Sequence, residues 1–182
     1  MPLSFSERRT IENWQTQHKV NIRPEQVEKL GQYRDLIVSW SGRMNLISKS
    51  DIPLILTNHI LDSLGAVILL PHKSHVVDVG SGAGLPGIPL AIARDDISMT
   101  LLESVHKKVV FLKEALNDLR QANVSILEAR LETTIRTRSY DVATVRALPR
   151  LESLIVKVQE LVRPGGMIIY YEKRGICRVI HV

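Results

Sequence analysis

The spacing of hydrophobic residues changes near residue 74. Before that point, apolar side chains recur every three or four positions, as Val27, Leu30 and Tyr33 do, and this is the period of a helix. After it, short runs of apolar and β-branched residues alternate with helical patterns. That alternation is typical of a parallel sheet whose strands are joined by helices. The pattern therefore predicts an α/β fold with helices at its N-terminus.

The first two helices have recognisable start and stop signals. Ser4 and Glu7 fit the capping box of a helix that ends near His18. Pro24 suits the first turn of a second helix, because its missing N–H costs nothing there. Gly42 is expected to end that helix. The apolar stripe of the second helix is interpreted as core packing rather than as a binding face.

A third helix is expected over residues 54–70, and it places His59 and Asp62 on one face. Such a pair could act as a catalytic dyad. No candidate nucleophile accompanies the pair in the sequence. A structural hydrogen bond between the two side chains is therefore the favoured interpretation.

Five strands are expected from residue 75 onward, at residues 76–79, 98–102, 124–127, 140–145 and 167–171. Parallel strands joined by right-handed crossovers would lie in the order 3-2-1-4-5. The fifth strand, Met167–Tyr171, would then be an apolar edge. Its unpaired backbone groups would invite pairing with another chain.

The first strand runs directly into a glycine-rich loop, which contains Gly80, Gly82 and Gly84. Glycine lets the backbone turn sharply and lets a ligand approach with no Cβ in the way. Backbone N–H groups at the start of the helix that follows favour an electron-rich or anionic group. The sequence therefore predicts a nucleotide-like small molecule over this loop.

The identity of that nucleotide depends on the residues around the glycines. Gly82, Gly84 and Gly87 satisfy the dinucleotide pattern, which alone is weak support for NAD. Asp78 lies inside the strand, where a dinucleotide site normally runs apolar, and it can orient the loop or reach a charged ligand through water. Glycines at every second position resemble the first motif of S-adenosylmethionine-dependent methyltransferases. A dinucleotide site and a turn without a ligand remain alternatives.

Glu103 ends the second strand, about twenty residues past the glycines. A carboxylate at this place can accept hydrogen bonds from both hydroxyls of an adenosine ribose. NAD and S-adenosylmethionine both carry that ribose, so Glu103 does not separate them. A surface glutamate at a strand end is the alternative interpretation.

Composition indicates the class of protein and its cellular compartment, but it says little about the function. The 182 residues are 45% hydrophobic, so the chain should be globular. A net charge of +5 is compatible with RNA binding, although many soluble enzymes are as basic. A single cysteine, Cys177, excludes an internal disulfide and a cysteine-cluster metal site. The sequence has no membrane-spanning run and no signal-peptide core, so we expect a cytoplasmic protein that does not bind a membrane.

Three separated segments follow the order and spacing of a known family: Trp40–Leu46, His59–Ser63 and Asp78–Leu90. Through them the chain resembles the small-subunit ribosomal RNA methyltransferase G family, also called glucose-inhibited division protein B. The resemblance implies a Rossmann-like class I methyltransferase fold with S-adenosylmethionine as cofactor. It also implies N7-methylation of one guanine in the 530 loop of bacterial 16S ribosomal RNA. The partner would be the small ribosomal subunit or an assembly intermediate, and we expect the protein to be a monomer.

The resemblance also assigns site residues by motif. Gly80 and Leu85 would line the cofactor, and Leu131 and Glu132 match the segment that contacts the adenine. Arg146 matches an arginine beside the methyl-transfer site and is the expected catalytic residue. The full expected cofactor site, without a metal, is Asp78, Gly80, Gly82, Gly84, Leu85, Glu103, Leu131, Glu132 and Arg146. Lys173 resembles a basic residue of the family, but Arg174 stands where the family has glycine, so its role stays open.

The implied chemistry needs no general base. Guanine N7 has a lone pair and no proton in the neutral base, so the protein must supply alignment and a suitable electrostatic setting. Arg146 could hold a phosphate or the guanine O6, or it could be a member of a structural ion pair. An NAD-dependent oxidoreductase and a non-catalytic RNA- or nucleotide-binding module are the alternative functions.

Two domains are expected, an N-terminal helical region over residues 1–73 packed on the sheet and a methyltransferase core over residues 74–182. The family continues through another helix and two strands, whereas residues 175–182 do not match it. This tail could fold back as a poor substitute, since Val179 and Ile180 are β-formers, but it is expected to be too short to replace them. A shortened chain of this kind would be less stable, more prone to association and weakly active.

Overall fold

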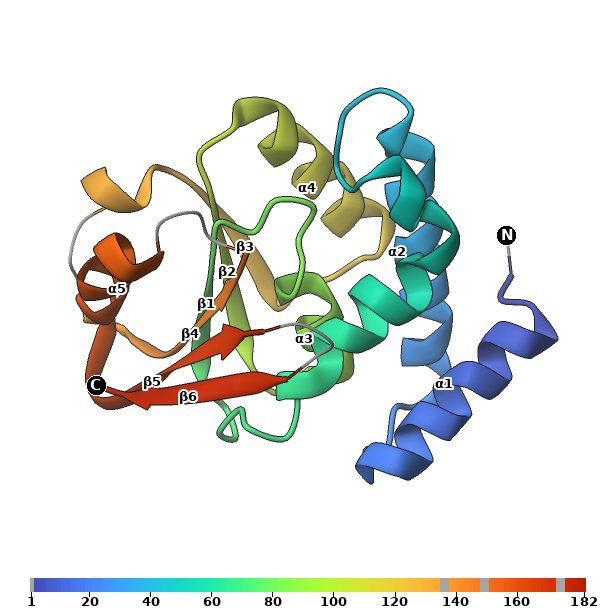
Figure 1. Cartoon of the computed structure of the whole chain (residues 1–182), viewed down its shortest axis with the longest axis horizontal. Coiled ribbons are helices and arrows are strands. Elements are labelled where there is room, and N and C mark those ends of the chain that lie inside the picture. The colour runs from blue at the N-terminus through green and yellow to red at the C-terminus, as the bar shows by residue number, and fades with distance from the viewer. Residues whose placement is uncertain (1, 135–137, 148–150, 173–175) are drawn as a thin grey trace.

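A six-stranded sheet forms the centre of the molecule (Figure 1). The structure is a computed structural model and describes residues 2–134, 138–147, 151–172 and 176–182. The strands are β1 (His75–Val79), β2 (Ser98–Glu103), β3 (Val124–Glu128), β4 (Tyr140–Arg146), β5 (Val162–Tyr171) and β6 (Cys177–His181). They lie in the order β3-β2-β1-β4-β5-β6, and all neighbouring pairs except β5–β6 are parallel. The expected order of the first five strands is confirmed.

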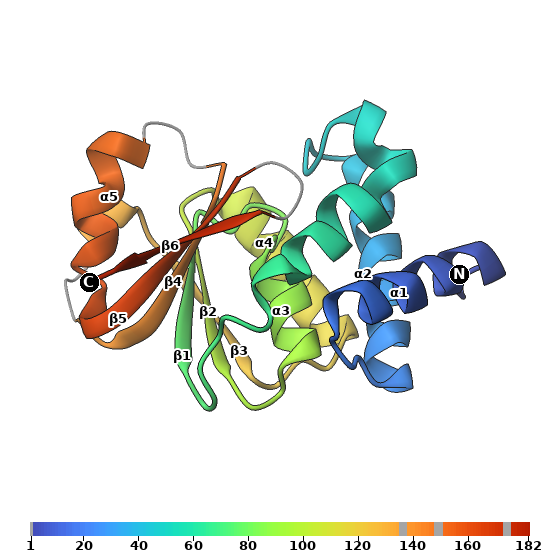
Figure 2. The same cartoon turned by 60° about the horizontal axis from the view of Figure 1, so that its bottom comes forward.

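Helices cover both faces of this sheet. They are α1 (Phe5–His18), α2 (Pro24–Ser41), α3 (Gly87–Ala93), α4 (His106–Asp118) and α5 (Leu151–Gln159). Figure 2 shows α5 on one side of the sheet and α1, α2 and α3 on the other. Alternate residues of β1 serve the two sides, since Val76 belongs to the core under α3 and α4 and Val77 belongs to the core under α5.

The tail of the chain corrects one expectation. Strand β6 pairs with β5 in antiparallel fashion from Met167–His181 to Tyr171–Cys177, so the apolar edge of β5 is covered. The backbone N–H of Gly165 also donates to the Val182 carbonyl at 2.8 Å. The expectation of an open β5 edge was wrong, because a single short strand suffices to satisfy its backbone groups.

The third helical region is less regular than expected. In place of one α-helix over residues 54–70, the chain forms the short 3₁₀ segments η1 (Lys49–Leu54) and η3 (Leu64–Ala66) and the π-helical turn η2 (Leu56–Leu61). Pro53 lies inside η1, where it supplies no N–H to an α-helical hydrogen-bond pattern. The widened turn at η2 places backbone carbonyls where the functional site uses them.

The N-terminal helices begin as their sequence signals predict. Ser4 and Glu7 form the capping box of α1, and Pro24 occupies the first turn of α2. Helix α2 is tied to the core through Gln26, whose Nε2 donates to the Ile92 carbonyl at 2.7 Å. The division of the chain into residues 1–73 and 74–182 remains a prediction.

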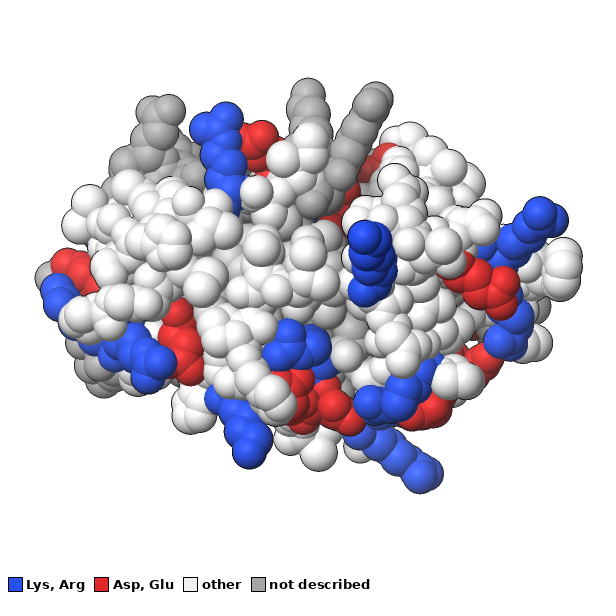
Figure 3. Space-filling view, turned by 90° about the horizontal axis from the view of Figure 1, so that it is seen from below, with Lys and Arg blue, Asp and Glu red and all other residues white. Residues whose placement is uncertain are grey.

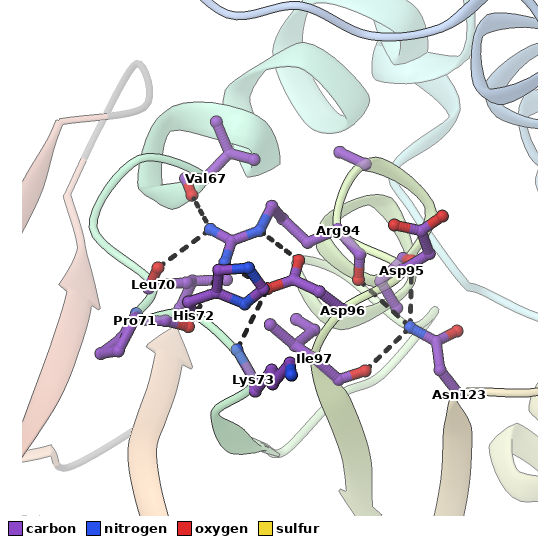
Figure 4. A network of polar contacts seen from close by, with 12 residues as sticks. Val67, Leu70, Pro71, His72, Lys73, Arg94, Asp95, Asp96, Ile97 and Asn123 are labelled. Atoms are coloured by element: carbon purple, nitrogen blue, oxygen red, sulfur yellow. Dashed lines mark hydrogen bonds and ion pairs between the residues drawn. The ribbon is translucent and has the colours of Figure 1, made fainter.

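A polar network lies at the amino ends of the strands, next to the start of β2 (Figure 4). The guanidinium of Arg94 donates to both carboxylate oxygens of Asp96, at 2.6 and 2.8 Å, and to the carbonyls of Val67 and Leu70. Asp96 also accepts the backbone N–H of Lys73. These hydrogen bonds with Arg94 hold the pKa of Asp96 well below its ordinary value. The network joins the end of the helical region to the turn between α3 and β2, away from the carboxyl ends of the strands.

Candidate functional site

The glycine loop leaves β1 at the point where the strand order reverses between β1 and β4. Open α/β sheets bind ligands at such a point, at the carboxyl ends of their strands. Gly80, Gly82 and Gly84 have φ values of 72°, 59° and 86°, which belong to the left-handed region. Glycine is the residue that adopts this backbone without strain. The glycines are therefore required by the turn itself.

Asp78 fixes the root of this loop from inside the core. Its carboxyl accepts the Thr144 hydroxyl at 2.9 Å and the Gly87 backbone N–H at 3.1 Å, so it joins β1 to β4 and to the start of α3. The residue is 1% exposed, and burial raises the pKa of its carboxyl to about 6. Of the two roles expected for Asp78, orientation of the loop is the one that this geometry serves.

Glu103 lies beside the loop at the end of β2, as its sequence position predicts. Its Oε2 accepts the Gly82 N–H at 2.8 Å, and its Oε1 accepts the N–H groups of Ser104 and Val105. The carboxylate therefore fixes the loop and the approach to α4 together. The Oε2 atom has a further lone pair, so Glu103 can still accept a hydrogen bond from a ligand.

Tyr33 of α2 also holds the loop, and sequence reasoning missed this role. Its hydroxyl donates to the Ala83 carbonyl at 2.5 Å, and burial raises the pKa of Tyr33 well above its usual range. In the sequence Tyr33 is one member of an apolar helical stripe. Nothing local distinguishes it from a residue that only packs, because its partner lies fifty positions away.

Arg146 occupies the carboxyl end of β4 and is anchored to η2 and the turn that follows. Its Nη1 donates to the His59 carbonyl at 3.2 Å and to the Ser63 hydroxyl at 3.0 Å. Its Nη2 donates to the Asn58 carbonyl at 3.1 Å and lies 3.2 Å from Asp62 Oδ2. The guanidinium thus takes part in a structural ion pair, which is one of the alternatives that the sequence leaves open.

His59 and Asp62 converge on Arg146. The Nδ1 atom of His59 accepts from Arg146 at 3.2 Å, and its Nε2 faces Asp51 at the same distance. Burial and the neighbouring guanidinium lower the pKa of His59, so its ring is neutral near pH 7. The expected hydrogen bond within the His59–Asp62 pair is thus replaced by contacts with Arg146 and Asp51.

The other expected site residues are Leu85, in the loop itself, and Leu131, Glu132 and Lys173, which lie further along the chain. Leu85 is half-buried against the main core, next to the glycines. Leu131 and Glu132 begin the turn η4 (Leu131–Thr133) after β3, where Leu131 packs against the core under α5 and Glu132 is exposed. Lys173 lies outside the described residues.

A cavity of about 1340 Å³ adjoins Arg146. Its walls come from α1, η2 and the carboxyl ends of β4 and β5, and Asp62 and Arg146 are part of its lining. The glycine loop lies at the end of the neighbouring strand β1. Among the described residues, no group of three or more His, Cys, Asp or Glu side chains is placed to bind a metal ion. None of the described helices has the length and apolar character that a bilayer span requires.

Comparisons with known proteins agree with this arrangement. A family model described as rRNA small subunit methyltransferase G matches residues 26–175. A Xanthomonas oryzae protein named ribosomal RNA small subunit methyltransferase G is 40% identical over 137 residues, which are 75% of this chain and 64% of that protein. A protein of the same name from Moorella thermoacetica is 36% identical over 162 residues, which are 86% of this chain and 68% of that protein. The chain thus spans slightly less than two thirds of the Xanthomonas relative.

Solved structures share the fold at low sequence identity. The M. jannaschii TYW2 complex with AdoMet has a TM-score of 0.54 at 19% identity, over 62% of this chain and 51% of that one. A predicted O-methyltransferase from Agrobacterium tumefaciens has a TM-score of 0.52 at 20% identity, over 60% and 59% of the two chains. This likeness shows a fold of the class I S-adenosylmethionine-dependent methyltransferase type.

Proposed function

The chain belongs to the rRNA small subunit methyltransferase G family, and from this premise we propose that it methylates N7 of a guanine in bacterial 16S rRNA with S-adenosylmethionine as methyl donor. The substrate is the RNA of the small ribosomal subunit or of an assembly intermediate. The protein acts as a monomer in the cytoplasm. The observation that carries the proposal is the glycine loop, held open by Asp78, Glu103 and Tyr33 at the switch point of the sheet.

The residues around the loop fit such a cofactor. A Cβ at Gly82 would meet only the Gly80 carbonyl oxygen, at 3.8 Å, so this part of the loop faces open space. We assign the ribose hydroxyls to Glu103, whose carboxylate stands beside that space. Gly80, Gly82, Gly84 and Leu85 would surround the rest of the molecule nearest β1. Leu131 and Glu132 are the proposed contacts of the adenine.

The bound cofactor supplies a methyl group on a sulfonium, and the protein needs only to align an acceptor with it. Guanine N7 attacks through its own lone pair, so no side chain has to remove a proton. Arg146 lies one strand from the loop and faces the large cavity, with 16% of its side chain exposed. We propose that this guanidinium lies beside the guanine and helps to hold its O6 edge in position, so that N7 is aligned with the methyl group.

Surface charge agrees with RNA as the partner only in part. The chain has a net charge of +5, but Lys and Arg are interspersed with Asp and Glu on the face shown in Figure 3. A mixed face of this kind does not hold a phosphate backbone by charge alone. On that face, charge therefore does not mark a binding surface for RNA.

Direct binding distinguishes the proposed function from its alternatives. Calorimetry with S-adenosylmethionine, S-adenosylhomocysteine and NAD is expected to give binding of the first two. Binding of NAD alone would instead support the oxidoreductase. Asp78 inside β1, where a dinucleotide site normally runs apolar, and the Gly-Leu-Pro-Gly-Ile-Pro run at residues 84–89 argue against that alternative. Methyl transfer to 30S subunits separates an active enzyme from a module that only binds RNA or the nucleotide.

A further inference from the structure

The cavity beside Arg146 is larger than one nucleotide requires. Pockets for small molecules commonly measure roughly 300–1,000 Å³, whereas this cavity has about 1340 Å³. One side of it is formed by the ends of β4 and β5, next to the proposed transfer site. The opposite side is formed by α1, which the proposed chemistry does not use. The space therefore extends from the transfer site to a wall with no assigned role.

That wall carries a stacked pair of aromatic rings. The rings of Trp14 and His18 lie one above the other, with their centroids 4.3 Å apart and their planes at 18°. Both residues line the cavity, and the His18 Nδ1 atom lies 2.9 Å from the Trp14 carbonyl, which fixes the imidazole in place. Unpaired bases of single-stranded nucleic acid stack on surfaces of this kind.

The polar groups near the stack are neutral amides. Asn13 and Gln17 of α1 are exposed and contribute to the same lining. An amide offers both donors and an acceptor, so it can pair with the edge of a base. The combination of a ring surface with adjacent amides is suited to a nucleobase.

The charges of the lining argue against a phosphate in this place. Arg146 is the only Lys or Arg among the described lining residues, and its guanidinium faces Asp62 at 3.2 Å. Glu172 adds a second carboxylate and is paired with Arg178. Within the described lining both carboxylates are paired with arginines, so no free cation is offered to a phosphate there, whereas an uncharged base needs none.

We propose that α1 is a second base-binding surface for the RNA substrate, on which a base flanking the target guanine stacks on the outer face of the Trp14–His18 pair and hydrogen-bonds to Asn13 or Gln17. The inference rests on the proposed function for the position of the target guanine near Arg146. It adds a second base-binding subsite to the transfer site, and it makes the N-terminal helix part of the substrate-binding surface.

The first test is kinetic and uses the full chain. Trp14→Ala is expected to raise KM for 30S subunits that lack the modification by about tenfold, since stacking of one base on an aromatic ring accounts for a factor of roughly 5 to 150. Trp14→Phe is expected to restore most of the loss. Affinity for S-adenosylmethionine, measured by calorimetry, should stay unchanged in both variants. The control is Thr16→Ala, an exposed residue of α1 outside the cavity lining.

The second test needs neither cofactor nor turnover. In a Trp40→Phe background Trp14 is the one remaining tryptophan, and its fluorescence is expected to be quenched on titration with a pentaribonucleotide centred on guanosine. An abasic residue beside that guanosine should weaken the binding by a similar factor. Equal binding of the two oligonucleotides, or an unchanged KM for folded Trp14→Ala, would overturn the proposed base-binding surface on α1. Failure of the parent protein to bind S-adenosylmethionine would instead overturn the proposed function, and the oligonucleotide titration would still decide the inference.

Discussion

Glu103 Oε2 accepts a hydrogen bond from the backbone N–H of Gly82 at 2.8 Å, across twenty-one positions of the chain. This contact joins the carboxylate at the end of β2 to the middle of the glycine loop. Because the same carboxylate accepts the N–H groups of Ser104 and Val105, three backbone donors fix its orientation before any ligand arrives. A preorganised acceptor of this kind costs little to order when a ribose binds.

Replacing Glu103 with glutamine should show how far cofactor binding depends on this carboxylate. The new side-chain amide would turn an NH₂ group toward one set of backbone donors and leave them unpaired, at a cost of about 1–3 kcal/mol in the free energy of unfolding. We expect Glu103→Gln to weaken S-adenosylmethionine binding by about tenfold or more, measured by calorimetry beside a thermal melt. Glu128→Gln, at the paired position of β3, is the matched control and should leave the affinity unchanged. Wild-type affinity in Glu103→Gln would remove this residue from the cofactor site.

Gly82→Val should abolish cofactor binding while the fold persists, because the new side chain enters the open space over the loop. The positive φ adds a strain of about 1–2 kcal/mol for any residue with a Cβ. Gly165→Val separates strain from obstruction, since Gly165 has a φ of 80° and a Cβ there meets nothing within 4 Å. If both folded variants bind S-adenosylmethionine equally well, the loop does not hold the cofactor.

Arg146→Ala should affect turnover far more than cofactor affinity. Loss of the guanidinium removes the group proposed to position the guanine, and it leaves Asp62 and the Asn58 carbonyl without this partner. We expect methyl transfer to fall by at least a hundredfold, which corresponds to about 2.7 kcal/mol of lost transition-state stabilisation. Arg146→Lys keeps the charge and should recover part of the rate. Single-turnover rates equal to those of the parent protein would end the catalytic assignment.

The Arg94–Asp96 network predicts an acid-sensitive contribution to stability. The folded-state pKa of Asp96 is lowered from an ordinary value of 3.8, chiefly by hydrogen bonds with Arg94. Its contribution is therefore present above pH 4 and is lost as the pH falls through the lower folded-state value. Asp96→Asn should lower the melting temperature at pH 7 and flatten its decline below pH 4. An identical acid profile in parent and variant would contradict this account.

Asp78 should act in the opposite direction. Burial raises its folded-state pKa from 3.8 to about 6, so its protonation favours the folded state below pH 4 and that contribution is lost as the pH rises through about 6. Asp78→Asn preserves the size of the side chain and removes the titration. Denaturant titrations of the parent protein should show a fall in unfolding free energy between about pH 4 and 6, and we expect the variant to lose that fall. Parallel curves for the two proteins over that range would contradict the assignment.

The sheet and the glycine loop could be predicted from the sequence, because each strand and the loop depend on residues that are close together in the chain. A β-branched run that ends in glycines fixed β1 and its loop, and Glu103 followed from its place at the end of the next strand. Tyr33 and the partners of Arg146 could not be found in this way, since those contacts join residues fifty or more positions apart. The β-forming residues Val179 and Ile180 indicated that the tail could fold back on β5, but the extent of the pairing depends on β5 and not on the tail's own sequence.

The central claim is tested most directly by mass spectrometry of 16S rRNA. Bacterial 30S subunits that lack the modification would be incubated with the full chain and S-adenosylmethionine, and the RNA would then be digested and analysed for methylated nucleosides. The account predicts N7-methylguanosine at a single position, with its formation lost in Arg146→Ala. A chain that binds S-adenosylmethionine but leaves the RNA without N7-methylguanosine, or that methylates another atom, would contradict it.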